Sequence, residues 1–192
     1  MIDHNRKFIF IDICRTGSTS IRVTLSDSKE KDINPRHHNI GNRYVKQSVM
    51  LTDNQIKNYF KFTIVRNPYD RLVSLWLWGY SKYNFSQFVN LVKNNKISKG
   101  FKYRYMPMID WIRDKNNKIH IDYIGRFENL NFHFSEICKR IKIDTPVLKK
   151  LNTGNERSGI IRKEYREYYN DDTKRIVTEI YKEDLERFKY SF

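Results

Sequence analysis

A short polar segment near the N-terminus has the residue types of an anion-binding loop. A near-continuous apolar run at 8–13 precedes it and predicts a buried strand, and Ile21, Val23, Thr24 and Leu25 after it are predicted to start a helix. A loop between a strand and a helix N-terminus presents backbone N–H groups and the positive end of the helix dipole to a phosphate. An ordinary turn capped by Ser18 or Thr19 would have the same composition, so both interpretations stay open here. The segment consists of Arg15, Thr16, Gly17, Ser18, Thr19 and Ser20.

Two later segments that are predicted to be strands also lead to an arginine. The run at 61–65 precedes Arg66, and a helix with Pro68 in its first turn is predicted to follow it. The run at 119–124 is predicted to be a third strand and leads to Arg126. Further helices are predicted at 52–59, 85–93, 132–141 and 171–188, and a loop at 151–159.

Strands that alternate with helices predict an α/β fold with a parallel sheet. Such sheets bind ligands at the carboxyl ends of their strands. We therefore expect segments 15–20 and 66–74 and Arg126 to lie along one rim of the sheet.

Length and composition narrow the class of protein. The 192 residues fit a single domain over 1–192, and no apolar run approaches the roughly 20 residues that span a bilayer. The N-terminus has no apolar leader, so we expect a cytoplasmic protein. Two cysteines, Cys14 and Cys138, are too few for a disulfide framework or a cysteine-based metal site, and no metal is predicted.

The net charge of +15 favours an anionic partner: a nucleotide, a sulfated or carboxylated glycan, nucleic acid or a membrane. The cations are scattered along the chain, and a composition rich in Lys, Asn, Ile and Tyr can arise without selection for binding. Charge alone therefore does not choose among these partners.

Four segments, in order, resemble motifs of the sulfotransferases that use 3′-phosphoadenosine 5′-phosphosulfate (PAPS), specifically their carbohydrate and heparan-type branch. CRTGSTSI is similar to the family's 5′-phosphosulfate loop, and FTIVRNPYDRLVS to its 3′-phosphate motif. DYIGRFENL and the segment from 165 to 192 also resemble the family. The resemblance implies a three-layer, P-loop-like α/β fold with a central parallel sheet flanked by helices. It also implies transfer of a sulfuryl group from PAPS to a hydroxyl acceptor, leaving the product PAP.

The resemblance implies roles for named residues. Segment 15–20 would hold the 5′-phosphosulfate, Arg66 and Ser74 the 3′-phosphate, and Arg126 would line the nucleotide site. Segment 152–162 corresponds to one that closes over the nucleotide in relatives, although its residues match loosely. No metal is implied.

The acceptor hydroxyl needs a general base, and histidine suits that role near neutral pH. His37 and His38 are the only histidines between the two phosphate motifs, and His38 is preferred. A surface histidine pair is the alternative, because the family's pattern around its histidine is incomplete here. Arg15 stands where the family has a lysine, so it would stabilise the leaving group by charge alone, since arginine does not give up a proton.

Two other classes remain as alternatives. A P-loop kinase or NTPase would need G-x-x-x-x-G-K-[ST], which is missing from this sequence. A non-catalytic basic protein that binds glycan or nucleic acid is suggested by the charge and by the alternating aromatic and basic residues at 101–105. Nucleic acid is the less expected partner, and a hydroxylated glycan, neutral or anionic, is the expected acceptor.

Overall fold

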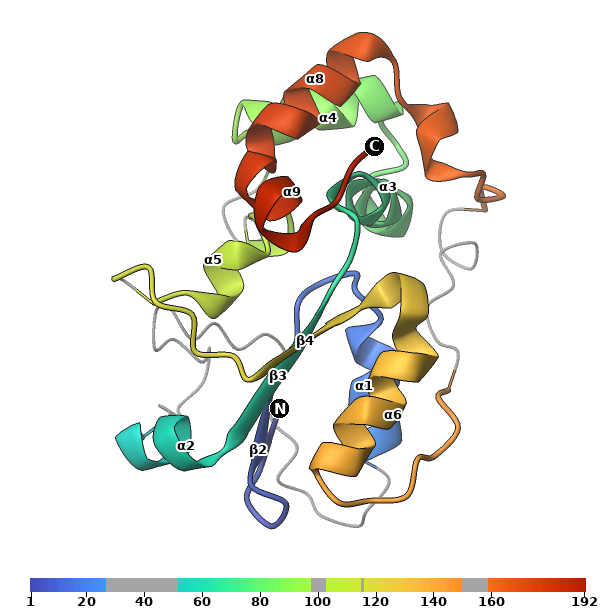
Figure 1. Ribbon diagram of the computed structural model, residues 1–192. Coiled ribbons are helices and arrows are strands. Elements are labelled where there is room, and N and C mark those ends of the chain that lie inside the picture. The colour runs from blue at the N-terminus through green and yellow to red at the C-terminus, as the bar shows by residue number, and fades with distance from the viewer. Residues whose placement is uncertain (27–51, 98–102, 115, 150–158) are drawn as a thin grey trace. The chain divides into compact units, whose positions relative to one another are not determined.

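The computed structural model describes residues 1–26, 52–97, 103–114, 116–149 and 159–192 (Figure 1). The chain divides into two compact units. Unit 1 comprises residues 1–65 and 108–151, and unit 2 comprises residues 66–107 and 152–192. Each unit has a hydrophobic core of its own.

Unit 1 is built on a four-stranded sheet with the order β1-β2-β3-β4. Its strands are β1 (Ile2–Asp3), β2 (Phe8–Ile11), β3 (Phe60–Val65) and β4 (Tyr123–Arg126). The pairs β2–β3 and β3–β4 are parallel, as the sequence predicts. The antiparallel edge strand β1 was not predicted, because two residues are too few to show a pattern.

The third predicted strand begins later than expected. The prediction placed it at 119–124, whereas β4 covers Tyr123–Arg126. The Asp114 carboxylate accepts hydrogen bonds from the backbone N–H groups of Asn116 and Lys118, at 2.8 and 2.9 Å. Ile119 forms an isolated antiparallel bridge with Arg113. This local turn takes the first predicted residues away from the parallel sheet.

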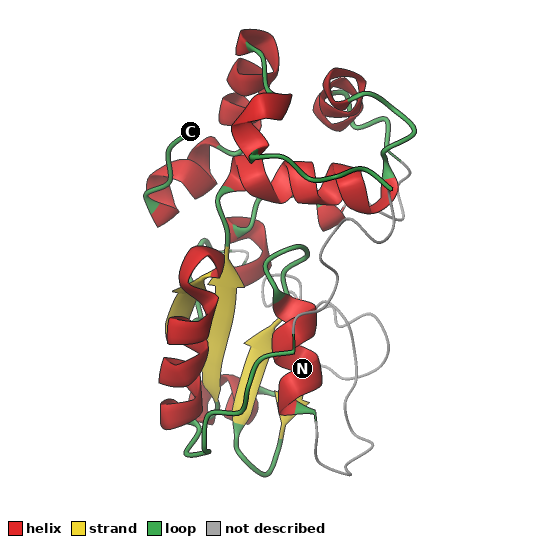
Figure 2. Ribbon diagram, turned by 90° about the vertical axis from the view of Figure 1, so that its right-hand side faces the viewer, coloured by secondary structure: helices red, strands yellow, loops and turns green. Residues whose placement is uncertain are grey.

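Helices α1 (Ser18–Leu25) and α6 (Leu130–Arg140) cover one face of the sheet (Figures 1 and 2). Phe8, Phe10 and Phe62 are fully buried on this face, and the rings of Phe10 and Phe62 stack with centroids 4.9 Å apart. The predicted 132–141 helix begins two residues earlier than expected. The remaining short elements of this unit are α2 (Asp53–Asn58), α5 (Ile109–Ile112) and the 3₁₀ turn η2 (Phe127–Asn129).

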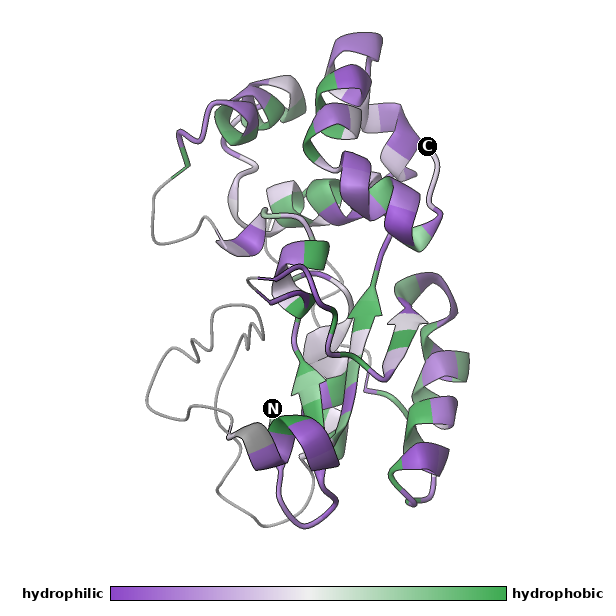
Figure 3. Cartoon of the chain, turned by 60° about the vertical axis from the view of Figure 1, so that its left-hand side comes forward, coloured by the Kyte–Doolittle hydropathy of each residue, from purple (hydrophilic) through white to green (hydrophobic). Residues whose placement is uncertain are grey.

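Figure 3 shows the sheet as mainly hydrophobic and the helices as alternating between hydrophobic and hydrophilic residues. This is the pattern expected for a mixed α/β protein whose sheet is flanked by helices. No helix within the described ranges is long and apolar enough to cross a membrane.

Unit 2 is helical. Its elements are α3 (Pro68–Gly79), α4 (Phe85–Lys93), the 3₁₀ turn η3 (Tyr165–Tyr168), α8 (Asp171–Ile180) and α9 (Lys182–Phe188). The single helix predicted at 171–188 is two helices that separate at Tyr181. Tyr181 is almost fully buried, and its hydroxyl donates a 2.6 Å hydrogen bond to the Tyr105 carbonyl. Burial raises the pKa of this phenol strongly, so it remains a neutral donor. We attribute the break to this tertiary contact, which helical periodicity does not reveal.

Candidate functional site

The polar loop of unit 1 joins the carboxyl end of β2 to the N-terminus of α1. Buried Thr16 donates a 2.9 Å hydrogen bond from its hydroxyl to the Ile13 carbonyl, which closes the loop on itself. Arg15 has a left-handed backbone, with φ of 68°, and its side chain is partly exposed. The loop is therefore a defined turn.

The N-cap of α1 is Gly17, and neither Ser18 nor Thr19, the two residues that the sequence offered as caps, fills that position. No side chain caps this helix among the described residues, and its first turn has no acidic residue. The electropositive end of α1 therefore faces the loop without a carboxylate from its own first turn, as an anion site requires.

Gly17 is required here for two separate reasons. Its φ of 79° is a conformation that side-chain-bearing residues rarely adopt. A Cβ at this position would also lie 2.8 Å from Leu130 Cδ2 and 3.0 Å from Phe127 Cδ2. The loop therefore packs tightly on the chain that follows β4.

Arg126 is the last residue of β4 and pairs with Val65, the last residue of β3. The loop that begins after Ile11 follows the carboxyl end of β2, which is parallel to both strands. Within unit 1, the loop and Arg126 thus lie at the same edge of the sheet, as expected. Arg66 is the next residue in the chain after Val65 and belongs to unit 2.

In unit 2, the first turn of α3 is held by several polar contacts. The Asn67 side chain accepts a 3.0 Å hydrogen bond from the Tyr69 backbone N–H and donates one of 2.8 Å to the Ser191 carbonyl. Tyr169 donates a 2.9 Å hydrogen bond to the Tyr69 carbonyl. Burial raises the pKa of Tyr169 well above its usual value, so this phenol is also a neutral donor. Residues near the C-terminus thus fix the start of α3.

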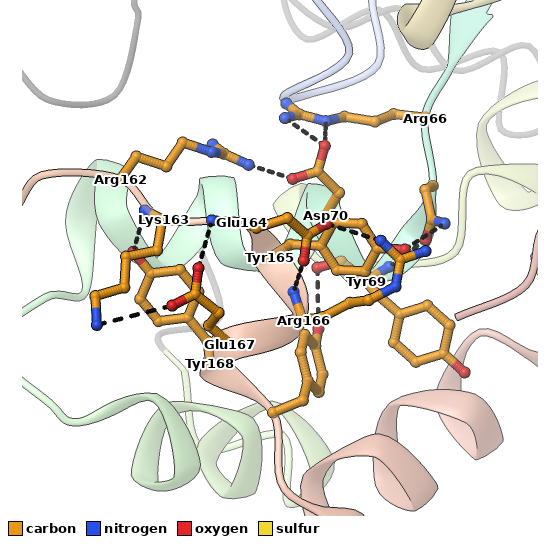
Figure 4. Close-up of polar contacts among 12 residues, drawn as sticks. Arg66, Tyr69, Asp70, Arg162, Lys163, Glu164, Tyr165, Arg166, Glu167 and Tyr168 are labelled. Carbon is orange, nitrogen blue, oxygen red and sulfur yellow. Dashed lines mark hydrogen bonds and ion pairs between the residues drawn. The ribbon is translucent and has the colours of Figure 1, made fainter.

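Two arginines converge on one carboxylate at this point (Figure 4). Arg66 Nε and Nη2 lie 2.8 and 2.7 Å from Asp70 Oδ2, and Arg162 Nη2 contacts Asp70 Oδ1. The side chains are 7%, 19% and 22% exposed for Arg66, Asp70 and Arg162. Two guanidinium groups and one carboxylate give these three groups a net charge of +1. We call these three residues the arginine cluster.

Ser74 lies one helical turn beyond Asp70 on α3 and is buried. Positions four apart share a face of a helix, so Asp70 and Ser74 lie on one side of α3. Asp70 was not among the predicted site residues, although its i,i+4 spacing from Arg66 is a signal that could have indicated it. Arg162 was named only as the end of a loosely matched segment, because a contact across 92 residues leaves no local pattern.

The two histidines predicted as candidate bases, His37 and His38, lie outside the described residues. The structure gives the other three histidines specific neighbours. His4 Nδ1 lies 3.0 Å from the Tyr59 hydroxyl, His120 Nε2 lies 2.8 Å from Asp114 Oδ2, and His133 Nδ1 lies 2.7 Å from the Tyr123 hydroxyl. Burial lowers the pKa of His133. Among the described residues, no group of three His, Cys, Asp or Glu side chains could hold a metal ion.

A polar loop after one parallel strand and a buried arginine after the next are typical of α/β proteins that bind phosphorylated ligands. The comparisons with known proteins narrow this class. The sulfotransferase family model matches residues 1–191, so the chain belongs to the sulfotransferase family. It is accordingly an enzyme of the kind that transfers sulfate.

One relative found among curated proteins is an uncharacterized protein of Archaeoglobus fulgidus. It is 29% identical over 99 residues, which cover 50% of this chain and 78% of the relative. No solved structure gives a significant match.

Proposed function

We propose that this enzyme transfers the sulfuryl group of PAPS to a hydroxyl group of a carbohydrate, releasing PAP. The observation that carries the proposal is the arginine cluster of Arg66, Asp70 and Arg162. PAP carries several negative charges. Arginine is the side chain best suited to bind a phosphate, because its guanidinium group can donate two parallel hydrogen bonds to two phosphate oxygens.

The roles of the unit 2 residues follow from this cluster. Arg66 and Ser74 bind the 3′-phosphate, as the resemblance to the family implies, and Arg162 adds a second guanidinium. Asp70 holds both arginines in place before the nucleotide arrives, which reduces the side-chain entropy that binding must overcome. A nucleotide without a 3′-phosphate makes fewer of these contacts and binds more weakly.

The roles of the unit 1 residues rest on the loop. Residues 15–20 bind the 5′-phosphosulfate through backbone N–H groups and hydroxyls, and Arg126 lines the nucleotide site. Arg15 neutralises the charge that develops on the leaving oxygen, without giving up a proton.

The base in this proposal is His38, with His37 as its alternate. It takes the proton of the acceptor hydroxyl as the acceptor oxygen bonds to sulfur and the bond between sulfur and the leaving phosphate oxygen breaks. Histidine suits this step because its neutral form is abundant near neutral pH. The net charge of +15 favours an acceptor that is itself anionic.

The experiment that tests the donor is a thermal-shift titration with PAP and with ATP. PAP should raise the melting temperature through linkage, and ATP should do so much less because it lacks the 3′-phosphate. Equal stabilisation by the two nucleotides would remove the 3′-phosphate site from the proposal.

Calorimetry on two variants locates that site. Arg66→Ala should weaken PAP binding by roughly 2–4 kcal/mol, the scale of losing one partner of a largely buried ion pair. Ser74→Ala should cost about 1 kcal/mol, the scale of one hydrogen bond. Unchanged PAP affinity in Arg66→Ala would exclude Arg66 from the site.

A further inference from the structure

Unit 2 contains a pocket of about 350 Å³ that the proposed function does not use. It lies among the last turn of α3, the turn that follows, the C-terminus of α4 and the segment around Arg104. The residues that line it are Trp78, Gly79, Tyr80, Lys82, Tyr83, Leu91, Lys96, Ile97 and Arg104.

Hydrogen bonds hold the first wall, the turn after α3. The Tyr80 N–H donates to the Trp76 carbonyl at 2.8 Å, and the Tyr83 N–H donates to the Tyr80 carbonyl at 3.0 Å. Trp76 Nε1 donates to the Tyr83 carbonyl at 2.8 Å. Tyr80 stacks on buried Phe88 with ring centroids 5.0 Å apart. The aromatic side of the pocket is therefore anchored to the core of unit 2.

The end of α4 forms the second wall. Asn95 has a left-handed backbone, its N–H donates to the Val92 carbonyl at 3.1 Å, and the Lys96 N–H donates to the Leu91 carbonyl at 2.9 Å. This pair of bonds is the Schellman pattern of a helix C-terminus. It fixes the backbone that carries Lys96 and Ile97 into the pocket lining.

The third wall is tied to α3 by a buried arginine. Arg71 donates to the Arg104 carbonyl at 3.0 Å and to the Met106 carbonyl at 3.0 and 3.1 Å. The Tyr181 hydroxyl bonds the carbonyl of Tyr105, between these two residues. The backbone around Arg104 is therefore held in place, and its guanidinium carbon lies 4.2 Å from the centroid of the Trp78 ring.

The chemistry of the lining is distinctive. It combines three aromatic side chains (Trp78, Tyr80 and Tyr83) with three cations (Lys82, Lys96 and Arg104), and none of the described lining residues is acidic. Aromatic side chains pack against flat or weakly hydrated rings, and guanidinium and ammonium groups bind anions. A volume of this size accommodates one ring with its substituents.

We propose that this pocket binds a ring that carries a sulfate or carboxylate group. The ring of the ligand lies among the aromatic side chains, and its anion lies near the two lysines and Arg104, whose guanidinium rests on Trp78. Two sources share this chemistry, an anionic sugar residue and an aryl sulfate or carboxylate. The proposal concerns binding in unit 2 and does not depend on the sulfuryl transfer proposed above.

Calorimetric titration of the intact chain tests this proposal with probes that differ in one feature at a time. The sugar probe is N-acetylglucosamine 6-sulfate, with N-acetylglucosamine as its neutral counterpart. The aryl probe is 4-nitrophenyl sulfate, with 4-nitrophenyl glucoside as its neutral counterpart. At least one sulfated probe should bind ten-fold or more tightly than its counterpart, and the better probe identifies the source.

Variants confirm the location. Arg104→Gln and Lys96→Gln should each lower the affinity for the preferred sulfated probe by about five-fold or more. Trp78→Leu, which removes an aromatic side chain of the lining, should lower the affinity for this probe by a similar factor. Lys174→Gln, an exposed lysine on α8 outside the lining, is the matched control and should bind as wild type does.

Three outcomes would overturn the proposal: no binding by either sulfated probe, equal binding by the neutral counterparts, or unchanged affinity in both Lys96→Gln and Arg104→Gln. Because Lys96 is exposed, its variant keeps the test decisive if Arg104→Gln fails to fold. PAP titration of the same variants separates the two proposals. Variants that lose probe binding but keep PAP binding would show that the pocket binds the probe and is separate from the nucleotide site. A wild-type chain that binds the probe but not PAP would refute only the proposed donor.

Discussion

Removing the carboxylate of Asp70 should destabilise the folded chain, because it leaves two arginines without their shared partner. Arg66 is buried, and its Nε and Nη2 atoms lie 2.8 and 2.7 Å from Asp70 Oδ2. Breaking a fully buried pair costs about 3–5 kcal/mol, whereas a fully exposed pair contributes about 0–1 kcal/mol. With side chains 7% and 19% exposed, we expect Asp70→Asn to lower the free energy of unfolding by about 2 kcal/mol.

A double-mutant cycle isolates the pairwise contribution. Urea denaturation of Asp70→Asn, Arg66→Met and the double variant should give a coupling energy of about 1–2 kcal/mol. The pair Arg175 and Glu179 on α8 is the matched control, since it is also spaced i,i+4 but is 59% exposed on both sides, with a closest N–O distance of 3.3 Å. Its coupling energy should be about 0.5 kcal/mol or less.

A second cycle with Arg162→Met tests whether Asp70 serves both arginines. Coupling in both cycles is expected, since each arginine contacts a different oxygen of Asp70. Additivity within about 0.5 kcal/mol in the Arg66 cycle would refute the arginine cluster as a structural unit and remove the preorganisation argument with it.

Three further changes have defined expected results. Gly17→Ala should lower the free energy of unfolding by about 1–3 kcal/mol in chemical denaturation, because φ is positive there and the added Cβ would meet Leu130. Gly79→Ala, with no atom within 4 Å of the added Cβ, should cost nothing, and equal effects of the two changes would contradict both reasons. Burial lowers the pKa of His133 below its usual 6.5, so its stabilising contribution is complete above pH 6.5 and is lost as pH falls through the lower pKa of the folded state. Melting curves should therefore show that His133→Gln loses less stability than wild type on acidification, and identical losses would refute this. His38→Ala should lower kcat about 10²–10⁴-fold with PAP affinity retained, with His37→Ala as the comparison; full turnover in both would exclude this pair as the base.

Much of unit 1 could be predicted from the sequence alone. Short apolar runs at 8–13 and 61–65 gave two neighbouring parallel strands, and the change to small polar residues after the first gave the loop. These features are local, because a buried strand needs consecutive apolar residues and a tight turn needs a residue such as Gly17. Family membership was also readable, since its motifs are short and contiguous.

Other features depended on tertiary contacts. The break at Tyr181 and the N-cap at Gly17 depart from the sequence predictions, because a helix boundary responds to buried hydrogen bonds and packing as well as to propensity. Arg162 meets Asp70 across 92 residues, and the pocket beside Trp78 assembles residues from 78 to 104. The sequence specifies which charges and rings the chain carries, but only folding brings them within interaction distance, because contacts between distant residues have no periodicity to reveal them.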